Sequence, residues 1–570
     1  MHPNSAILLI LRRMRAPLIV LITLYAVSVL GLTLLPGVDA DGRPWHMSFF
    51  HAFYVISYTA TTIGFGEIPY PFSDAQRMWV TFSIYLSVIG WAYAIGTLLA
   101  LVQNRAFQNA IAMQRFGRAV RRVREPFYLV CGYGETGQLL CRAFDHLNRR
   151  FVVLDIDPAR IEDLELQDLR IDAPGITADA RHPDNLLLAG LTSRHCIGVI
   201  ALTSDDEANL VVAAATRLLH NGEASILCRV TRPEIADNMK SFGIGHIINP
   251  FETFGEYLAL AIRSPGSYQL MEWLTSTPGA TLKPQREPPR GHWILCGYGR
   301  FGQAIADDLQ VEGIDLTVIE PDHSIACTSQ NVHGVGNERH VLEQAGIERA
   351  VGIIAGTNND IANLAIVATA AERKPDLFTV LRQNLQSNQS LFSTFQADFI
   401  VRPAQIIAHE CLGLLMTPLL ARFLAEVKRR DDAWSDAVVA RIAQTCGERV
   451  PMTWNVALDG RGAPSLEPAL RGNAEIELNA LLRDPTNRQE RLNAVPLLVL
   501  RAGQQHVLPD DSFALRAGDD ILFASTRTAR ARLQGTLVNV NDRDYVLHGR
   551  AQRAGWLWRK LARDPQSVAP

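Results

Sequence analysis

Two long stretches without charge dominate the first hundred residues. Residues 16–38 and 78–104 contain no Asp, Glu, Lys or Arg. A helix that crosses a bilayer needs about 20 predominantly apolar residues, and both Pro17–Leu35 and Met78–Val102 supply them. The pattern therefore predicts two membrane-spanning helices.

Basic residues flank the two predicted spans. Arg12, Arg13 and Arg15 precede the first, and six arginines follow the second between residues 105 and 124. Because the cytoplasmic flanks of membrane helices are rich in Lys and Arg, both ends of the chain are expected in the cytoplasm. A secretory signal peptide is the alternative for the first run, but the run is longer than an ordinary signal core and no convincing small-residue cleavage site follows.

A third stretch without formal charge, Pro44–Gly66, lies between the spans. Its regular part, residues 47–59, has the length of a segment that enters the membrane and returns, and a third crossing would put one arginine-rich flank outside. Irregular backbone at membrane depth is tolerated only where protein buries it or where it lines an aqueous path. The following segment, Thr61–Glu67, is therefore expected to coordinate ions.

The filter motif within this segment is Thr62-Ile63-Gly64-Phe65-Gly66, which resembles the selectivity filter of potassium channels. The order span, half-helix, filter, span resembles their two-helix pore. The resemblance implies K⁺ coordination at Thr62, Ile63, Gly64 and Phe65 and a homotetramer of chains around one axis. Phe65 and Glu67 stand where Tyr and Asp are commoner in this family. These departures affect the expected conductance and leave the expected ion, K⁺, unchanged. A glycine turn between two helices is the alternative.

No arginine-rich membrane helix precedes the pore, so the charges that a voltage sensor needs are absent. Opening of the pore is therefore expected to be controlled by another part of the chain. Gly90 and Gly96 in the second span are candidates for a gating hinge. Close helix packing around a small residue is the alternative for each.

An internal repeat begins at about residue 127. Residues 126–157 and 292–322 each contain a short apolar strand, a GxGxxG turn, a helix and a second apolar strand that ends in an acid. The acids, Asp155 and Glu320, each stand 18 residues after the last glycine. Two such motifs in strand and helix context are a strong signal for nucleotide binding. The glycines are Gly132, Gly134 and Gly137 in the first repeat and Gly297, Gly299 and Gly302 in the second.

The chemistry of this motif fits a nucleotide. Glycines let the backbone approach a pyrophosphate at a helix N-terminus, and the acid accepts hydrogen bonds from ribose hydroxyls. Because an acid there disfavours a 2′-phosphate, NAD or an ADP/ATP-type nucleotide is expected rather than NADP. Arg300, after the second glycine of repeat two, suits phosphate, whereas Glu135 at the same place in repeat one repels it unless the side chain turns to solvent. Either repeat could instead be a structural Rossmann unit without a ligand.

The similarity between the repeats continues, because residues 198–217 parallel residues 352–373. Each repeat is therefore expected to form a complete doubly wound α/β domain. Together with the pore, the two copies resemble the tandem RCK domains of potassium channels and the TrkA subunits of potassium transporters. The resemblance implies base contacts by Asp179 and Asn337. The expected first site is Gly132, Gly134, Glu135, Thr136, Gly137, Asp155 and Asp179, and the expected second site is Gly297, Gly299, Arg300, Phe301, Gly302, Glu320 and Asn337.

The chain is accordingly expected to form a two-span α-helical pore, two Rossmann-like domains and a small α+β subdomain. Residues 250–274 and 404–430 are predicted to be packing helices, short strands and turns are predicted from residue 431, and 551–563 reads as a basic amphipathic helix that docks on the cytosolic assembly or touches membrane. The predicted divisions are a pore at 1–104, a linker at 105–126, a first RCK domain at 127–275, a linker at 276–291, a second RCK domain at 292–430, a TrkA-C-like subdomain at 431–545 and a tail at 546–570.

The charge balance and the cysteine pattern limit which binding partners and which redox compartment are expected. Lys and Arg number 55 against 58 Asp and Glu, which gives no support to a nucleic-acid partner. The eight cysteines contain no CxxC pair, a pattern typical of reduced thiols in a cytosolic setting. Some RCK channels hold Ca²⁺ with carboxylates, but the matching positions here are Ala201, Arg229 and Thr231, so that site is expected to be absent. The adjacent Asp205–Glu207 is either a cation ligand or an acidic helix start.

The function expected from the sequence is a potassium-selective channel of the bacterial or archaeal plasma membrane, gated by a nucleotide that binds a ring of RCK domains, and not an enzyme. One alternative function is a membrane-anchored NAD-dependent oxidoreductase. The chain offers no separate substrate domain, which argues against it. The other is a membrane-bound regulatory subunit of a potassium transporter, which a complete pore in each chain argues against. Whether the ligand opens or closes the pore is left open.

Overall fold

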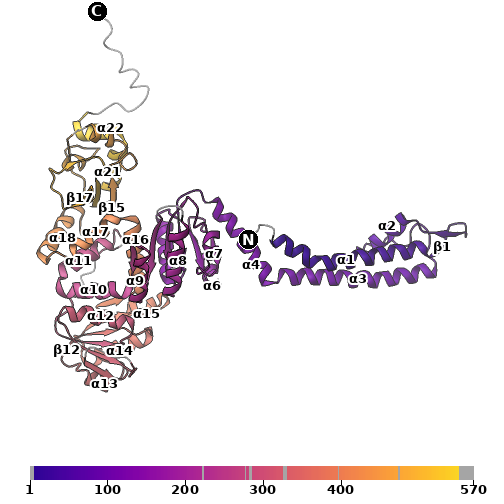
Figure 1. Cartoon of the computed structure of the whole chain (residues 1–570), viewed down its shortest axis with the longest axis horizontal. Helices are drawn as coiled ribbons and strands as arrows, with labels where there is room; N and C mark the ends of the chain where they lie inside the picture. The colour runs from indigo at the N-terminus through magenta and orange to yellow at the C-terminus, as the bar shows by residue number, and fades with distance from the viewer. Residues whose placement is uncertain are drawn as a thin grey trace, which may run out of the picture. The chain divides into compact units, whose positions relative to one another are not determined.

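The computed structural model describes residues 5–220, 224–276, 278–281, 286–324, 330–395, 397–472 and 475–550. The chain divides into two compact units, Met1–Arg124 and Glu125–Pro570 (Figure 1). Each unit is described by itself below. The amphipathic tail predicted at 551–563 lies outside the described residues.

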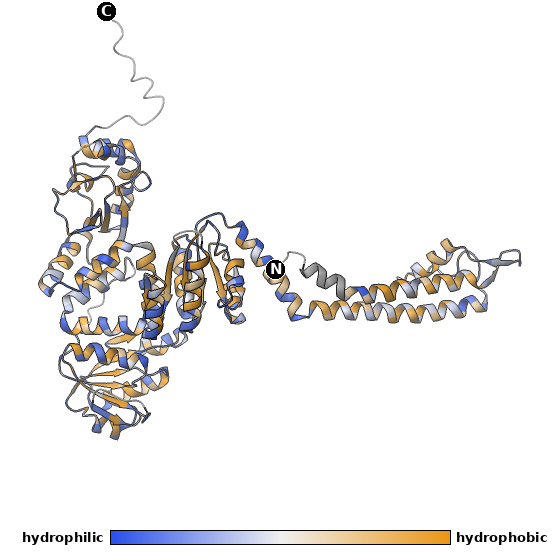
Figure 2. Ribbon diagram, in the orientation of Figure 1, coloured by the Kyte–Doolittle hydropathy of each residue, from blue (hydrophilic) through white to orange (hydrophobic). Residues whose placement is uncertain are grey.

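The first unit is built on two long helices, α1 (Ser5–Leu34) and α3 (Asp74–Val102). Their segments Met14–Leu34 and Asp74–Val102 are long and apolar enough to cross a membrane, which confirms the two predicted apolar helices. Figure 2 shows apolar residues along both helices. Side chains such as Ile22 and Ile89 lie exposed on them, as expected for surfaces that face lipid or another chain rather than water.

A short helix, α2 (Phe49–Ala60), lies between these spans at the place predicted for the half-helix. The strands β1 (Pro36–Val38) and β2 (Pro44–His46) pair antiparallel just before it. The helix packs on α1 through a small core that includes Val29, Leu32, Ala52, Val55 and Ile56. The predicted linker after the second span contains a further helix, α4 (Arg105–Arg122).

The second unit contains two parallel six-stranded sheets of identical strand order. The first is ordered β5-β4-β3-β6-β7-β8 and the second β11-β10-β9-β12-β13-β14, which in chain order is 3-2-1-4-5-6, the Rossmann arrangement. The predicted doubly wound domains are thus confirmed. The strands are β3 (Phe127–Cys131), β4 (Arg150–Asp155), β5 (Gly175–Thr177), β6 (Cys196–Ala201), β7 (Ser225–Arg229) and β8 (His246–Ile248), then β9 (His292–Cys296), β10 (Asp315–Glu320), β11 (Gln330–His333), β12 (Ala350–Ala355), β13 (Phe378–Arg382) and β14 (Phe399–Val401).

The helices of the two domains follow from the same local signals. The central strands β3 and β9 are buried along their whole length, as expected for a parallel sheet covered on both faces. The helices of the first domain are α5 (Glu135–His146), α6 (Pro158–Leu166), α7 (Pro183–Leu188), α8 (Asp206–Leu219) and α9 (Pro233–Ser241). Those of the second are α12 (Arg300–Val311), α13 (Arg339–Gln344), α14 (Asp360–Arg373), the 3₁₀ turn η1 (Gln386–Asn388) and α15 (Gln389–Thr394).

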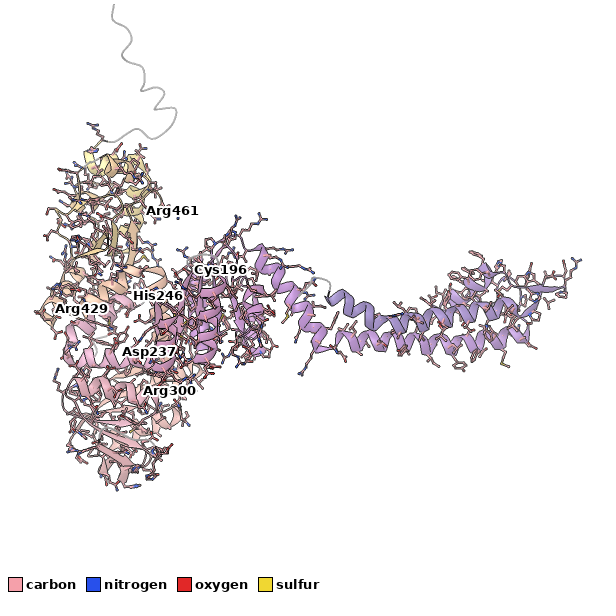
Figure 3. All side chains as sticks on the ribbon, viewed as in Figure 1. Cys196, Asp237, His246, Arg300, Arg429 and Arg461 are labelled. Carbon is pink, nitrogen blue, oxygen red and sulfur yellow. The ribbon has the colours of Figure 1, made fainter. Side chains whose placement is uncertain are left out.

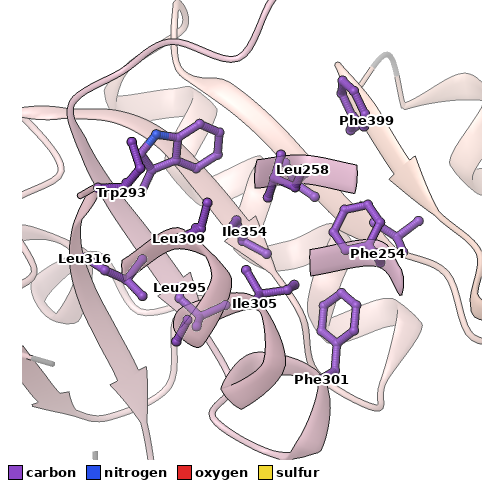
Figure 4. Packing of buried hydrophobic residues seen from close by; sticks show 14 of the residues in the cluster. Phe254, Leu258, Trp293, Leu295, Phe301, Ile305, Leu309, Leu316, Ile354 and Phe399 are labelled. Atoms are coloured by element: carbon purple, nitrogen blue, oxygen red, sulfur yellow. The ribbon is translucent and has the colours of Figure 1, made fainter. Parts of the chain in front are cut away.

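The helices that follow the two sheets are exchanged between the domains. Helix α10 (Pro250–Arg263) follows the first sheet but packs on α12 of the second domain, and α16 (Pro403–Met416) follows the second sheet but packs on α5 of the first. Figure 4 shows Phe254 and Leu258 of α10 among the second domain's Phe301, Ile305 and Ile354. Ile407 and Cys411 of α16 belong to the core of the first domain. The exchange ties the two domains into one unit.

Both predicted packing helices are shorter than expected, because each is interrupted at a proline. Residues 250–274 form α10 and α11 (Pro265–Thr275), and residues 404–430 form α16 and α17 (Pro418–Val427). Proline disfavours helical dihedrals in the preceding residue and begins a new helix instead. The bent pair α16 and α17 is apolar enough to be counted as a third span by composition, yet Leu420 and Phe423 are buried in a protein core.

The C-terminal part begins with a helix rather than with the short strands predicted from residue 431. Helix α18 (Asp432–Cys446) precedes the first strand and is capped by Asp431. The strands β15 (Met452–Ala457), β17 (Ala494–Arg501), β18 (Gln504–Val507) and β20 (Asp520–Ser525) form an antiparallel sheet ordered β15-β20-β17-β18. The remaining elements are α19 (Glu467–Arg471), β16 (Ile476–Glu477), α20 (Leu478–Leu481), β19 (Ala514–Leu515), α21 (Arg527–Val538) and α22 (Val540–His548).

Candidate functional site

The loop after α2 returns toward the helix that it leaves. The backbone N–H groups of Ile63 and Gly64 both donate to the carbonyl oxygen of Tyr58, at 2.9 and 3.4 Å. Gly64 and Gly66 have φ of +66° and +94°, in the left-handed region that glycine adopts without strain. In the part of the chain that the structure describes, no donor bonds the carbonyl oxygens of Thr62–Phe65. These four oxygens are therefore available to a cation.

Ring contacts of Phe65 and hydrogen bonds of Glu67 fix this loop to neighbouring residues. The ring of Phe65 stacks on Tyr54 with a centroid separation of 6.3 Å and lies edge-on to Tyr58 at 5.6 Å. Glu67 accepts a hydrogen bond from the Phe72 N–H at 2.8 Å and from Arg77 Nε at 2.8 Å. Neither Tyr58 nor Arg77 was predicted as part of the site, because neither belongs to the filter motif.

The two hinge candidates differ in their surroundings. A Cβ on Gly90 would lie 2.8 Å from Leu24 Cδ1, whereas a Cβ on Gly96 would meet none of the described atoms within 4 Å. Gly90 thus permits the close approach of α1 and α3. Helix α3 runs unbroken through both positions.

The second repeat forms a cavity of about 430 Å³ around its glycine turn. Gly297 has a φ of +95°, and a Cβ on Gly302 would lie 2.1 Å from the Gly297 carbonyl oxygen. Glu320, at the end of β10, accepts hydrogen bonds from the N–H groups of Tyr298 at 2.7 Å and Asp322 at 3.1 Å. The cavity walls include Gly297, Gly299, Arg300, Phe301, Glu320 and the loops 334–336 and 356–358. The structure thus brings together most of the residues predicted for the second site.

The glycine turn of the first repeat has the same backbone but a different neighbour. Gly132 has a φ of +106°, and Asp155 accepts hydrogen bonds from the N–H groups of Tyr133 and Asp157. The Arg160 guanidinium, however, lies against Gly134, 2.9 Å from the position of a Cβ there, and forms an ion pair with Asp155 at 3.5 Å. A ligand of the first site would therefore have to share or displace this side chain.

Three other predicted residues of these sites lie in different settings. Thr136 is buried in the first turn of α5. Glu135 lines a separate crevice of about 200 Å³ with Gln383, Asn384 and Arg402 of the second repeat. Gly137 packs directly against the Gly132 carbonyl oxygen.

The two residues predicted to contact the base, Asp179 and Asn337, have the following surroundings in the structure. Asp179 pairs with Arg181 at 2.8 Å, and hydrogen bonds from Arg181 lower the pKa of Asp179 below its ordinary value. Asn337 is exposed, and its carbonyl oxygen accepts a hydrogen bond from Thr369. Asn337 is not among the residues that line the second cavity.

The acidic stretch Asp205–Glu207 is the helix start that the sequence allowed. Asp205 caps α8, and Asp206 is buried and accepts hydrogen bonds from the N–H and hydroxyl of Thr231. Glu207 pairs with Arg232 at 3.2 Å. Among the described residues, no group of three or more His, Cys, Asp or Glu is placed to hold a metal ion.

Two arginines that were not predicted for the nucleotide sites line the second cavity. Arg229 ends β7 and Arg382 ends β13, at equivalent places in the two repeats. Arg382 lies over the rings of Phe251 and Phe301, at 5.1 and 4.8 Å from their centroids. The sequence contains a signal for these two arginines, because the corresponding strands of the two repeats, ILCRV and TVLRQ, carry Arg at the same position.

Comparisons with known proteins divide the chain in the same way. A family model described as an ion channel matches residues 18–104. A family model described as a TrkA-N domain matches twice, at residues 128–250 and 293–403. The matches thus fall on the span region and on each Rossmann repeat.

Curated relatives include proteins of potassium transport. Potassium channel protein 1 of Methanocaldococcus jannaschii is 24% identical over 229 residues, which are 40% of this chain and 67% of that protein. The Trk system potassium uptake protein TrkA homolog of Pyrococcus horikoshii is 28% identical over 142 residues, 23% of this chain and 62% of that protein. A solved structure of the GsuK channel bound to NAD is 17% identical, with a TM-score of 0.45, over 94% of this chain and 99% of that chain. With one ion-channel domain ahead of two TrkA-N domains, the chain is homologous to prokaryotic potassium channel proteins.

Proposed function

We propose that the chain is one subunit of a homotetrameric potassium-selective channel in a bacterial or archaeal plasma membrane, with both termini in the cytoplasm. NAD or an ADP/ATP-type nucleotide bound by the TrkA-N repeats opens or closes it. The observation that carries the proposal is the loop Thr62–Phe65, whose four carbonyl oxygens lack a donor in the described chain and stand between two membrane-length helices. A dehydrated K⁺ requires such oxygens in place of its water shell.

Four copies of the chain complete this site. One chain supplies one strand of oxygens and leaves the loop open, with Ile63 60% and Phe65 59% exposed. An apolar groove of about 600 Å³ between α1 and α2, lined by Leu21, Tyr25, Val29 and Phe53, is also open in the single chain. A closed ring of four chains around the loop would surround the ion with carbonyls on all sides.

The second repeat is the better nucleotide site in this proposal. Its cavity joins the glycine turn, Arg300 and Glu320 in the arrangement that holds a pyrophosphate and a ribose. In the first repeat, Arg160 competes for the same space. Four chains bring eight TrkA-N domains together. A nucleotide that binds one arrangement of these domains more tightly than another would shift their population, pull on the connection 102–124 and spread the second spans. Gly96, where an added Cβ would meet no described atom within 4 Å, suits the hinge better than Gly90.

Ion flux in liposomes tests the pore. The wild type should carry K⁺ well above Na⁺, and Gly64→Ala should abolish this preference, because Ala is strained at a φ of +66°. Gly42→Ala is the matched control, since Gly42 has a φ of +77° in the turn between β1 and β2, outside the filter. Equal fluxes of Na⁺ and K⁺ through the wild type would refute the pore, as would a stable dimer by mass measurement in detergent.

Nucleotide titration of the same preparation tests the regulation. Glu320→Ala should raise the nucleotide concentration for half-maximal gating by about tenfold to a hundredfold, because a charge-assisted hydrogen bond to ribose is lost. Asp155→Ala should have a smaller effect, and ion selectivity should stay unchanged in both. Unchanged nucleotide binding in both single variants and in the double variant would show that the Rossmann units are scaffolds.

A further inference from the structure

The second span is followed at once by a helix that starts in a new direction. Helix α3 ends at Val102, and Asn104, with ψ of 118°, is not helical and caps α4 with its side chain. The Gln108 side chain donates to the Val102 carbonyl oxygen at 3.1 Å and fixes this junction. Figure 1 shows α4 leaving the end of α3 at an angle. Because α3 is of membrane length up to Val102, α4 begins close to the bilayer surface.

The segment around α4 carries a large excess of positive charge. Six arginines lie between residues 105 and 124, and the chain contains no acidic residue between Asp74 and Glu125. None of the six forms an ion pair with a carboxylate of the described residues. The next acid along the chain, Glu125, pairs with Arg150 at 3.1 Å. The part of the chain that the structure describes thus leaves the charge of α4 without a counterion.

One side of α4 is covered by protein, and the other is open. Phe116 and Val120 are each only 5% exposed. Arg115, Arg118 and Arg122 are exposed. Their spacing of three and four residues places them in one row along the helix surface. The open side of the second half of α4 is therefore basic.

The same row begins with apolar residues in the turns next to the span. Phe107 and Ile111 precede Arg115 at intervals of four residues, so they lie on its face of the helix. Both are partly exposed. A helix that lies at a membrane surface places apolar side chains at the edge of the acyl region, while arginines reach the lipid phosphates. The order of residues along this row fits such a surface.

Ion conduction restricts the direction in which the row can face. In the proposed tetramer, K⁺ passes between the ends of the four α3 helices. Arginines that pointed at this path would repel a cation at short range. The row from Arg115 to Arg122 therefore has to face away from the axis, toward the surrounding lipid.

We propose that α4 is a docking surface for anionic lipids of the cytoplasmic leaflet, with Arg115, Arg118 and Arg122 on headgroup phosphates and Phe107 and Ile111 at the acyl boundary. It rests on the proposed function for the side of the membrane on which α4 lies. Each arginine near an anionic surface strengthens binding about fivefold. Three arginines give up to about a hundredfold, so lipid composition would set how firmly the connection 102–124 is held at the membrane.

Hydrogen exchange of the full-length protein in nanodiscs tests this surface. Exchange at residues 105–122 should be about tenfold to a hundredfold slower in discs that contain anionic phosphatidylglycerol than in discs of phosphatidylcholine alone, because docking opposes the local opening that exchange requires. The triple variant Arg115→Gln, Arg118→Gln, Arg122→Gln should lose this difference. Replacement of the same three residues by Lys should keep most of it, since the attraction depends on charge. In about 1 M salt, where the Debye length is about 3 Å, the difference should disappear.

A matched control removes the same charge from the second unit. Arg429→Gln, Arg461→Gln and Arg527→Gln together replace three exposed arginines, two of which are labelled in Figure 3. The control should leave the difference at residues 105–122 unchanged. An equal loss in the control would assign the effect to net charge and overturn the α4 surface, as would equal exchange of the wild type in the two kinds of disc.

Two further outcomes separate this inference from its neighbours. Protection of residues 105–122 by millimolar inorganic phosphate in phosphatidylcholine discs would assign the row to a soluble anion and overturn the lipid. The exchange measurement needs neither ion flux nor nucleotide. A wild type that conducts no K⁺ in liposomes would therefore refute the pore, while slower exchange of α4 in anionic discs would still support the docking surface.

Discussion

The hydroxyl of Tyr58, on the short helix α2, donates a hydrogen bond to the carbonyl oxygen of Gly66 at the end of the pore loop. Phe65, the residue before Gly66, has no hydroxyl and contacts Tyr58 only with its ring. Tyr58 therefore holds the C-terminal end of the loop by a hydrogen bond, from a position four residues before the filter motif begins.

Replacement of Tyr58 by Phe removes this tether and keeps the ring. One lost hydrogen bond of about 0.5 to 1.5 kcal/mol should lower the K⁺ over Na⁺ selectivity by about twofold to tenfold, measured from reversal potentials in planar bilayers. Tyr54→Phe is the control, because Tyr54 meets Phe65 by ring stacking. If both variants change selectivity alike, the rings rather than the hydroxyl hold the loop.

Removal of the Arg160 side chain should open the first nucleotide site. Arg160 lies against Gly134 and pairs with Asp155 and Asp157, where a ribose and phosphate would lie. Arg160→Ala costs about 0 to 1 kcal/mol of stability as a partly exposed pair and should increase the number of nucleotides bound per chain at saturation. Loss of binding instead would mean that Arg160 itself holds the ligand.

The exchange of α10 and α16 predicts crossed effects of core mutations. Leu258 on α10 is fully buried in the core of the second domain, and Ile407 on α16 is buried in the core of the first. Truncation of either to Ala should cost about 2 to 5 kcal/mol. Hydrogen exchange should show lost protection at residues 292–401 for Leu258→Ala and at residues 127–248 for Ile407→Ala. The opposite pattern would rule out the exchange.

Stability should depend on pH through Asp308, which lies on α12 where it faces Gly255 of α10. Burial raises its pKa from 3.8 to about 6, with additions from Glu256, Asp307 and Glu252 and a smaller opposite effect of Lys428. Because the folded state holds the proton more tightly than the unfolded chain, this group makes stability fall as the pH rises from about 4 to about 6.

Asp308→Asn removes the ionisable carboxyl group and with it this fall in stability as the pH rises. The variant should be more stable than the wild type at pH 8, by about 1 kcal/mol once solvent screening of a half-exposed group is allowed for. The difference in melting temperature should shrink as the pH is lowered toward 4. An equal gain at both pH values would assign the effect to packing against Gly255 rather than to ionisation.

Much of this protein was readable from local sequence. The two apolar runs predict the two long helices, and the paired GxGxxG motifs with Asp155 and Glu320 predict the two Rossmann domains, because each signal depends on a short stretch of chain. The breaks at Pro265 and Pro418 could also have been predicted from the prolines themselves. The roles of the filter and nucleotide residues remain predictions that the proposed experiments test.

The sequence by itself determined which segments are spans, strands and glycine turns, since hydrophobic period and backbone freedom are properties of neighbouring residues. Only the tertiary structure decided which domain each linking helix covers, because an amphipathic helix has the same apolar face whichever partner it meets. It also decided that Arg229 lies in the cavity of the other repeat and that Arg160 covers Gly134. These placements join groups that are distant in the chain or rest on a side-chain direction, and no local pattern encodes them.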